Sequence, residues 1–77
     1  MLLAKQLNIS TMQMYYFIEV ANCENFTLAA KQLYTTPSTL SKAIGSLETE
    51  LDVRLFVRSN KRLYITEAGR HLYHTWK

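Results

Sequence analysis

Cysteine, proline and glycine are scarce in this chain. Its 77 residues include one cysteine, one proline and two glycines. The lone cysteine, Cys23, excludes a disulfide framework within the chain and fits a reducing compartment. The scarcity of glycine and proline argues against disorder and for one small folded domain. No apolar run approaches membrane-spanning length, and the first ten residues are too polar for a secretory signal. We therefore expect a cytoplasmic protein without a membrane segment.

Residue sets that carry catalysis are also missing. The sequence has no Ser/His/Asp arrangement, no paired carboxylates and no glycine-rich phosphate loop. His71 and His74 lie three residues apart without an acid or cysteine ligand set nearby, so we interpret them as surface histidines. Cys23 has no basic neighbour in sequence and is interpreted as an ordinary loop thiol. These gaps predict a protein that is not an enzyme and that holds neither metal nor cofactor.

Acidic residues are absent between Val53 and Thr66, although acids and bases are mixed elsewhere and the net charge is only +3. The cations of this stretch are Arg54, Arg58, Lys61 and Arg62. Leu55–Arg58 and Leu63–Thr66 are expected to pair as two strands around a tip at residues 59–62. Such a hairpin either binds a polyanion or is an edge hairpin kept soluble by its charges. The charges alone leave both interpretations open.

Helical periodicity dominates the rest of the chain. The first helix should begin near Ser10, which has capping-box spacing with Gln13, and should end around residues 22–25. The second should run from about Thr27, its expected cap, to Leu33. A final helix should start with Thr66 as its cap and continue to the end of the chain.

The helix that follows the second one has the clearest start and two different faces. Thr36 is the expected N-cap, and Pro37 falls at the first helical position, where its missing N–H costs nothing. The expected buried stripe is Leu40, Ala43, Ile44, Leu47 and Leu51. The opposite face consists of Ser38, Ser41, Lys42, Gly45 and Thr49. Its first half has no acid, and the helix dipole adds partial positive charge there.

The two adjacent helices around residues 26–47 form a candidate helix-turn-helix. Ala30 is the small residue expected early in the motif, whereas Tyr34 stands where many such motifs have glycine. An ordinary helical hairpin in a bundle is the alternative. In the final helix, Leu72 and Trp76 lie four residues apart on one apolar ridge, with Tyr73 beside them. That ridge either packs back on the first helix or meets another chain.

Residues from Ser10 to Trp76 resemble the N-terminal winged helix-turn-helix domain of LysR-type bacterial transcriptional regulators. The residues that carry the resemblance are Tyr16-Phe17, Phe26-Thr27, Ala29-Ala30, Leu33, Leu40-Ser41, Ile44, Leu47-Glu48, Glu50-Leu51, Leu55-Phe56, Arg58 and Thr66-Glu67-Ala68-Gly69. Three positions depart from the family pattern. Pro37 stands where the family usually has a glutamine that helps to read DNA, Ser38-Thr39 stand where proline or serine, often followed by alanine, is usual, and Asp52 replaces a frequent glycine.

The resemblance implies a mainly α fold, with a three-helix core, a two-stranded wing and a C-terminal linker helix. Residues 1–9 would be an N-terminal extension, residues 10–66 the DNA-binding domain, and residues 67–77 the start of the linker helix. The family's effector domain would be absent, so a small-molecule effector would bind only in that missing part. Such a regulator would work in the bacterial cytoplasm, at the nucleoid.

The same resemblance implies sequence-specific binding of double-stranded DNA, with the helix that begins at Pro37 in the major groove and the hairpin on the minor groove or phosphates. The expected DNA-binding residues are Thr27, Thr36, Pro37, Ser38, Thr39, Ser41, Lys42, Arg58, Lys61 and Arg62. A homodimer would form through the final helix, at Leu72, Tyr73 and Trp76. The alternative function is a protein-interaction module with the same fold, which would need apolar residues on the outer face of the third helix. An RNA-binding variant would need clustered exposed aromatics.

Overall fold

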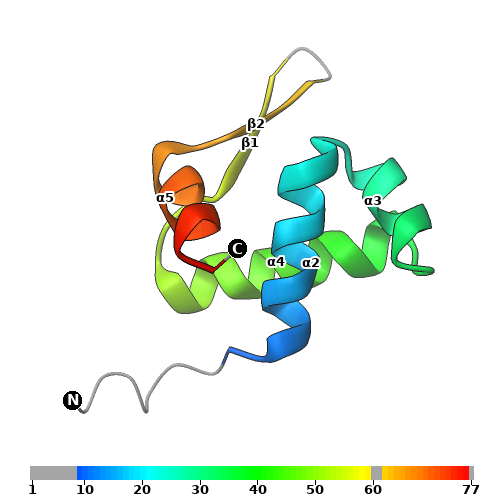
Figure 1. The fold of residues 1–77 in the computed structure, drawn as a ribbon, viewed down its shortest axis with the longest axis horizontal. Coiled ribbons are helices and arrows are strands. Elements are labelled where there is room, and N and C mark those ends of the chain that lie inside the picture. Colours follow the sequence, from blue (N-terminus) through cyan, green and yellow to red (C-terminus); the bar gives the residue numbers. More distant parts are fainter. Residues whose placement is uncertain (1–8, 60–61, 77) are drawn as a thin grey trace.

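The structure is a computed structural model that describes residues 9–59 and 62–76. Its elements are, in chain order, α2 (Thr11–Cys23), α3 (Phe26–Gln32), α4 (Pro37–Leu51), β1 (Phe56–Ser59), β2 (Arg62–Ile65) and α5 (Glu67–Trp76). The three helices α2, α3 and α4 pack against one another, and the two strands project from them as a wing (Figure 1). The predicted mainly α, winged helix-turn-helix architecture is confirmed. No helix among the described residues has the length and apolar character to cross a membrane.

Side-chain caps fix where the helices begin. Gln13 N donates to Ser10 Oγ over 3.1 Å, and Ser10 N donates to Gln13 Oε1 over 2.8 Å, so the predicted capping box is confirmed. Thr39 N donates to Thr36 Oγ1 over 3.1 Å, with Pro37 in the first turn of α4, as expected. These local signals are strong because each cap satisfies a backbone N–H that the helix itself leaves unpaired.

The expected cap of α3 was wrong. Asn25, and not Thr27, caps this helix, because Asn25 Oδ1 accepts a hydrogen bond from Leu28 N over 2.8 Å. Thr27 therefore lies within the first turn, with its side chain exposed. At the other end, Thr35 N donates to Ala30 O, and Tyr34 adopts a left-handed conformation with φ 57°. This is the bond pattern of a Schellman turn, with tyrosine where glycine is usual.

The hydrophobic core lies where α2, α3, α4 and the start of the wing meet. Its buried residues are Phe17, Val20, Ala29, Ala30, Leu40, Ile44, Leu47, Leu55 and Phe56. Three positions of the predicted α4 stripe are buried, whereas Ala43 and Leu51 stay half-buried. The rings of Phe17 and Phe56 lie 5.5 Å apart, so the wing is packed onto α2 as well as joined to the chain.

The wing is an antiparallel pair in which Phe56 faces Ile65 and Ser59 faces Arg62. Each strand is shifted by one residue from the prediction. β1 begins at Phe56, one residue after the expected Leu55, and Thr66 follows β2 because it caps α5. Phe56 is buried as predicted, while Leu63 and Ile65 are half-buried. Part of the predicted tip, residues 60–61, lies outside the described residues.

Helix α5 returns to α2. Thr66 Oγ1 accepts from Gly69 N over 3.0 Å, which confirms the predicted cap. The ring of Trp76 meets Phe17 edge-on at 6.0 Å, and Tyr73 Oη donates to Asn22 Oδ1 near the end of α2. Of the two alternatives for this ridge, packing within the chain is thus present. Leu72, Tyr73 and Trp76 are each only half-buried by it.

Candidate nucleic-acid interface

The outer face of α4 is exposed, as the sequence predicted. Ser38, Thr39, Ser41 and Lys42 all lie on the surface, and Gly45 is half-buried. No side chain on the first two turns of this face carries a negative charge. Together with the partial positive charge of the helix N-terminus, this face is suited to an anionic partner.

Hydroxyl groups cluster at the start of α4. Thr36 Oγ1 accepts from Thr39 N and donates to Thr39 Oγ1 over 3.0 Å. Because Thr36 donates its proton inside this pair, the Thr39 hydroxyl keeps its own proton for a donor bond outward. Pro37 is exposed and has no hydrogen-bonding side chain. The first turn therefore presents the Ser38 and Thr39 hydroxyls beside an apolar ring.

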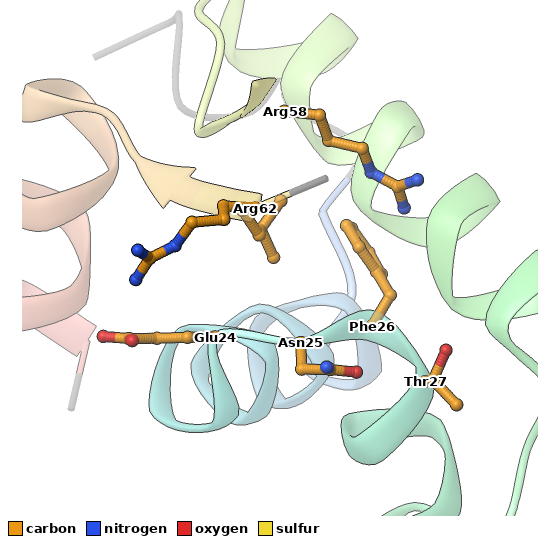
Figure 2. Close-up of a pocket in the computed structure, with 7 residues that line it drawn as sticks. Glu24, Asn25, Phe26, Thr27, Arg58 and Arg62 are labelled. Atoms are coloured by element: carbon orange, nitrogen blue, oxygen red, sulfur yellow. The ribbon is translucent and has the colours of Figure 1, made fainter. Parts of the chain in front are cut away.

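A cleft of about 380 Å³ separates the start of α3 from the wing (Figure 2). It is lined by Glu24, Asn25, Phe26, Thr27, Arg58, Arg62 and Leu63. Three predicted site residues thus come together, because Thr27 lies beside Arg58 and Arg62, which are more than 30 positions later in the chain. The Arg58 guanidinium lies 4.9 Å from the centre of the Phe26 ring, a cation–π geometry. Glu24 at the rim is a negative charge that the sequence did not assign to the site.

The Phe26 ring that carries Arg58 is itself supported. It meets the ring of Phe56 at 6.1 Å, and Phe56 meets Phe17, which meets Trp76. Four aromatic rings therefore form a continuous row from the first cleft to the last helix. Arg62 makes a longer cation–π contact, because its guanidinium lies 5.7 Å from the centre of the Tyr64 ring.

A second cleft, of about 350 Å³, runs between α4 and β1. Ser41, Gly45 and Glu48 line its helical side, and Arg54 and Arg58 line the opposite side. Because Arg58 lines both clefts, the α4 face and the wing form one continuous surface. Arg54 belongs to the basic stretch but was not among the predicted site residues. Its side chain is 73% exposed.

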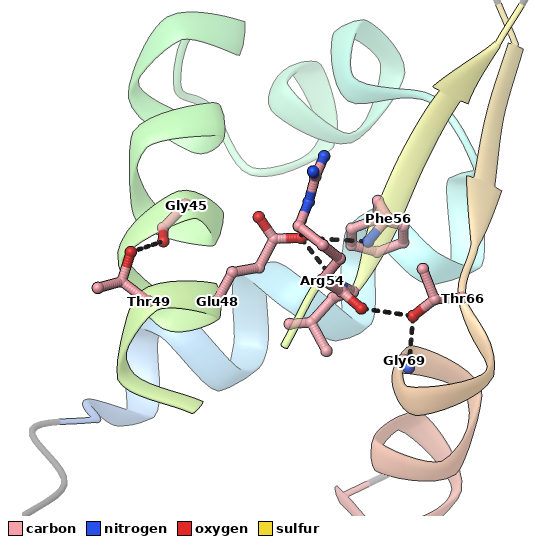
Figure 3. A network of polar contacts seen from close by, with 8 residues as sticks. Gly45, Glu48, Thr49, Arg54, Phe56, Thr66 and Gly69 are labelled. Carbon is pink, nitrogen blue, oxygen red and sulfur yellow. Dashed lines mark hydrogen bonds and ion pairs between the residues drawn. The ribbon is translucent and has the colours of Figure 1, made fainter. Parts of the chain in front are cut away.

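Glu48 holds the two sides of the second cleft together (Figure 3). Its Oε2 accepts hydrogen bonds from Leu55 N over 2.7 Å and Phe56 N over 3.2 Å. Arg54 Nε lies 3.9 Å from the same oxygen. The Arg54 carbonyl in turn accepts a 2.6 Å bond from Thr66 Oγ1. This network fixes the start of the wing against α4 and α5. The sequence identifies Glu48 only as part of the Leu47-Glu48 pair and does not predict this role.

The remaining predicted residues lie elsewhere. Lys61 is outside the described residues. Leu72, Tyr73 and Trp76 are on α5, which lies on the other side of α2 from α3 (Figure 1). Cys23 is half-buried beside Glu19, and burial together with that carboxylate raises the pKa of its thiol. Among residues 9–59 and 62–76, no cluster of His, Cys, Asp and Glu has the composition of a metal site.

Comparisons with known proteins agree with this geometry. The family model for bacterial regulatory helix-turn-helix proteins of the lysR family matches residues 11–70. The HTH-type transcriptional regulator DsdC of Escherichia coli is 39% identical over 61 residues, which are 79% of this chain and 20% of DsdC. The chain spans about one fifth of the length of the curated relatives that it matches.

Two similar solved structures contain DNA. A crystal structure of a CbnR_DBD-DNA complex has a TM-score of 0.84 and 31% identity, over 88% of this chain and 78% of that one. A BenM_DBD/catB site 1 DNA complex has a TM-score of 0.84 and 29% identity, over 88% and 73% of the two chains.

Proposed function

Because this chain belongs to the LysR family of bacterial helix-turn-helix regulators, we propose that it binds double-stranded DNA sequence-specifically and so regulates transcription. The observation that carries the proposal is the continuous surface formed by the α4 face and the wing, which Arg58 joins. The DNA in the two similar complexes supports the choice of partner.

Helix α4 enters the major groove with its first turns. The hydroxyls of Ser38, Thr39 and Ser41 accept or donate at base edges, and Lys42 pairs with a guanine edge or a phosphate. Thr36 positions Thr39 through their hydroxyl bond. Pro37 contributes no hydrogen bond and instead offers its ring to an apolar group such as a thymine methyl. Sequence preference therefore comes mainly from Ser38, Thr39 and Ser41.

The wing and the start of α3 bind the DNA backbone. Arg58 and Arg62, with Lys61 between them in sequence, lie on phosphates or along the minor groove, and the Thr27 hydroxyl meets a phosphate beside Arg58. If Lys42, Arg58, Lys61 and Arg62 each neutralise one phosphate, log affinity should fall with log salt at a slope of about −3.6. Contacts to phosphates supply affinity and orientation without reading bases.

Selection of bound fragments from a random duplex pool tests the proposal. Enrichment of one motif is expected, and three variants can then be compared with the parent. Arg58→Ala should weaken binding to the motif and to scrambled DNA by similar factors, whereas Ser38→Ala or Thr39→Ala should change which motif is selected. A pool that stays random while the protein remains folded would refute sequence-specific binding.

A protein-interaction module is less well supported. Its docking surface would be the outer face of α4, and that face carries Ser38, Ser41, Lys42 and Gly45, none of which is a large apolar residue. The RNA alternative has three exposed tyrosines, but Tyr15, Tyr34 and Tyr64 belong to α2, the helix-turn-helix turn and β2. Competition between duplex DNA and single-stranded RNA at two salt concentrations separates these partners.

The dimer is a further part of the proposal. Leu72, Tyr73 and Trp76 remain half-exposed on α5 after packing on the core, so they offer apolar surface to the same helix of a second copy. Two domains would then read two half-sites. Sedimentation of the parent and Trp76→Ala, with His71→Ala on the exposed side of α5 as control, tests this contact. A parent that sediments as a monomer at every concentration would exclude it for this chain.

Residues 10–66 are assigned to DNA binding and residues 67–77 to the start of a linker helix. Because the chain spans only about one fifth of its curated relatives, effector binding is assigned to the portion of such proteins that it does not include. The bacterial cytoplasm is the proposed location, since the partner is DNA.

A further inference from the structure

The two glycines of this chain lie in very different surroundings. A Cβ atom added at Gly69 would lie 2.5 Å from Leu55 O and 2.8 Å from Ile65 Cγ1, so the fold itself requires glycine there. A Cβ atom added at Gly45 would meet no atom within 4 Å other than its chain neighbours and the backbone of its own helix. Gly45 also sits in the middle of the 15-residue helix α4, where glycine is among the least favourable residues. Packing among residues 9–59 and 62–76 therefore does not account for Gly45.

Gly45 is the centre of the outer face of α4. Ser41 lies one turn before it and Thr49 one turn after it, with the Thr49 hydroxyl bonded to Gly45 O over 3.0 Å (Figure 3). Gly45 lines the second cleft and also a neighbouring hollow of about 280 Å³ near Asp52 and Val53. Arg54 lines both of these hollows too. The bare main chain at Gly45 therefore lies between two depressions that share one arginine.

That arginine is available for another partner. Its side chain is largely exposed, and its ionic contact with Glu48 is a long one of 3.9 Å. Exposed ion pairs of this kind contribute little. The Glu48 oxygen is in any case held by the N–H groups of Leu55 and Phe56. Arg54 can therefore turn to a phosphate without leaving a carboxylate unpaired.

We propose that Gly45 is the position at which the DNA sugar–phosphate backbone makes van der Waals contact with the main chain of α4, and that Arg54 pairs with the phosphate seated there. This proposal rests on the proposed DNA binding. In it, the missing side chain at Gly45 determines how closely the duplex approaches α4. A side chain at position 45 would hold the duplex away from the helix. Ser41 and Lys42 on the preceding turn would then reach the bases less well.

A double-mutant cycle on the selected DNA motif tests the inference. Gly45→Ala should raise Tm by several degrees, because alanine favours the helix and meets no atom, yet should weaken DNA binding about tenfold, as expected for one lost charge-assisted contact. The matched control is Ser46→Ala, an exposed neighbour that lines neither hollow and should leave affinity unchanged. Arg54→Ala should weaken binding. It should also make the slope of log affinity against log salt less steep by about 0.9, the value for one phosphate contact.

The cycle also separates the possible failures. Arg54→Ala should have little further effect in the Gly45→Ala background, because both changes remove the same phosphate contact. The proposed phosphate contact at Gly45 is refuted if Gly45→Ala binds as tightly as the parent, or if the affinity losses of Gly45→Ala and Arg54→Ala simply add. Neither result would contradict DNA binding itself. If the folded parent itself selects no motif, the proposed function fails and this inference fails with it.

Discussion

Removal of the Glu48 carboxylate should be the most damaging single change to the wing. One oxygen of this side chain accepts from the backbone N–H groups of Leu55 and Phe56, at 2.7 and 3.2 Å. Leu55 is completely buried and Phe56 is 5% exposed, so water cannot easily replace the carboxylate. The change Glu48→Ala therefore leaves two donors without a partner at the junction between α4 and β1.

The expected loss can be estimated from these two bonds. A buried N–H without an acceptor costs about 1–3 kcal/mol, so Glu48→Ala should cost about 2–6 kcal/mol. A domain of this size has a total stability of only about 4–12 kcal/mol. Since about 1 kcal/mol shifts Tm by roughly 4–8 °C in such a domain, Tm should fall by at least about 8 °C. Glu48→Gln keeps a neutral acceptor and should lose about half as much.

Thermal unfolding followed by circular dichroism measures this loss. Asp52→Asn is the matched control, because it removes the same charge from the C-terminal cap of the same helix. Asp52 is exposed and has φ 58°, a conformation that asparagine adopts readily, so this variant should stay within about 0.5 kcal/mol of the parent. If Glu48→Ala and Asp52→Asn unfold at the same temperature, Glu48 does not hold the wing and the estimate is refuted.

For three other positions, the structure predicts whether stability or reactivity should rise or fall. Tyr34→Gly should raise the free energy of unfolding by about 0.5–1 kcal/mol in urea, because the left-handed residue is 97% exposed and loses no packing; a loss would contradict the strain. Gly69→Ala should lower it by about 1–3 kcal/mol, since the added carbon overlaps Leu55 O; an unchanged value would refute the close approach. Cys23 should react with iodoacetamide more slowly in the folded protein than in urea at pH 8, because a raised thiol pKa leaves less thiolate; equal rates would contradict that shift.

Local signals accounted for most of what the sequence predicted correctly. The caps at Ser10 and Thr36 act over three residues, and the alternation of faces along α4 follows from helical geometry alone. The cap of α3 was missed because Asn25 and Thr27 are both good capping residues two positions apart. Only the backbone path out of α2 decides between them.

Contacts between distant elements could not be predicted. Glu48 serves residues seven and eight positions away, on the far side of a turn whose course depends on the whole fold. The same holds for Arg54, which lines the second cleft beside Ser41 and Gly45 of α4 although it follows that helix in the chain. The sequence also left two places for Trp76, since an apolar ridge does not say which apolar surface covers it.

The row of four rings from Phe26 to Trp76 has a consequence for how the two ends of the domain behave. Closely packed side chains transmit displacement because there is no empty space to absorb it. We therefore expect a change in the tilt of α5 to be passed through Phe17 and Phe56 to the Phe26 ring that stacks on Arg58. The position of α5 and the orientation of the Arg58 guanidinium should then depend on each other.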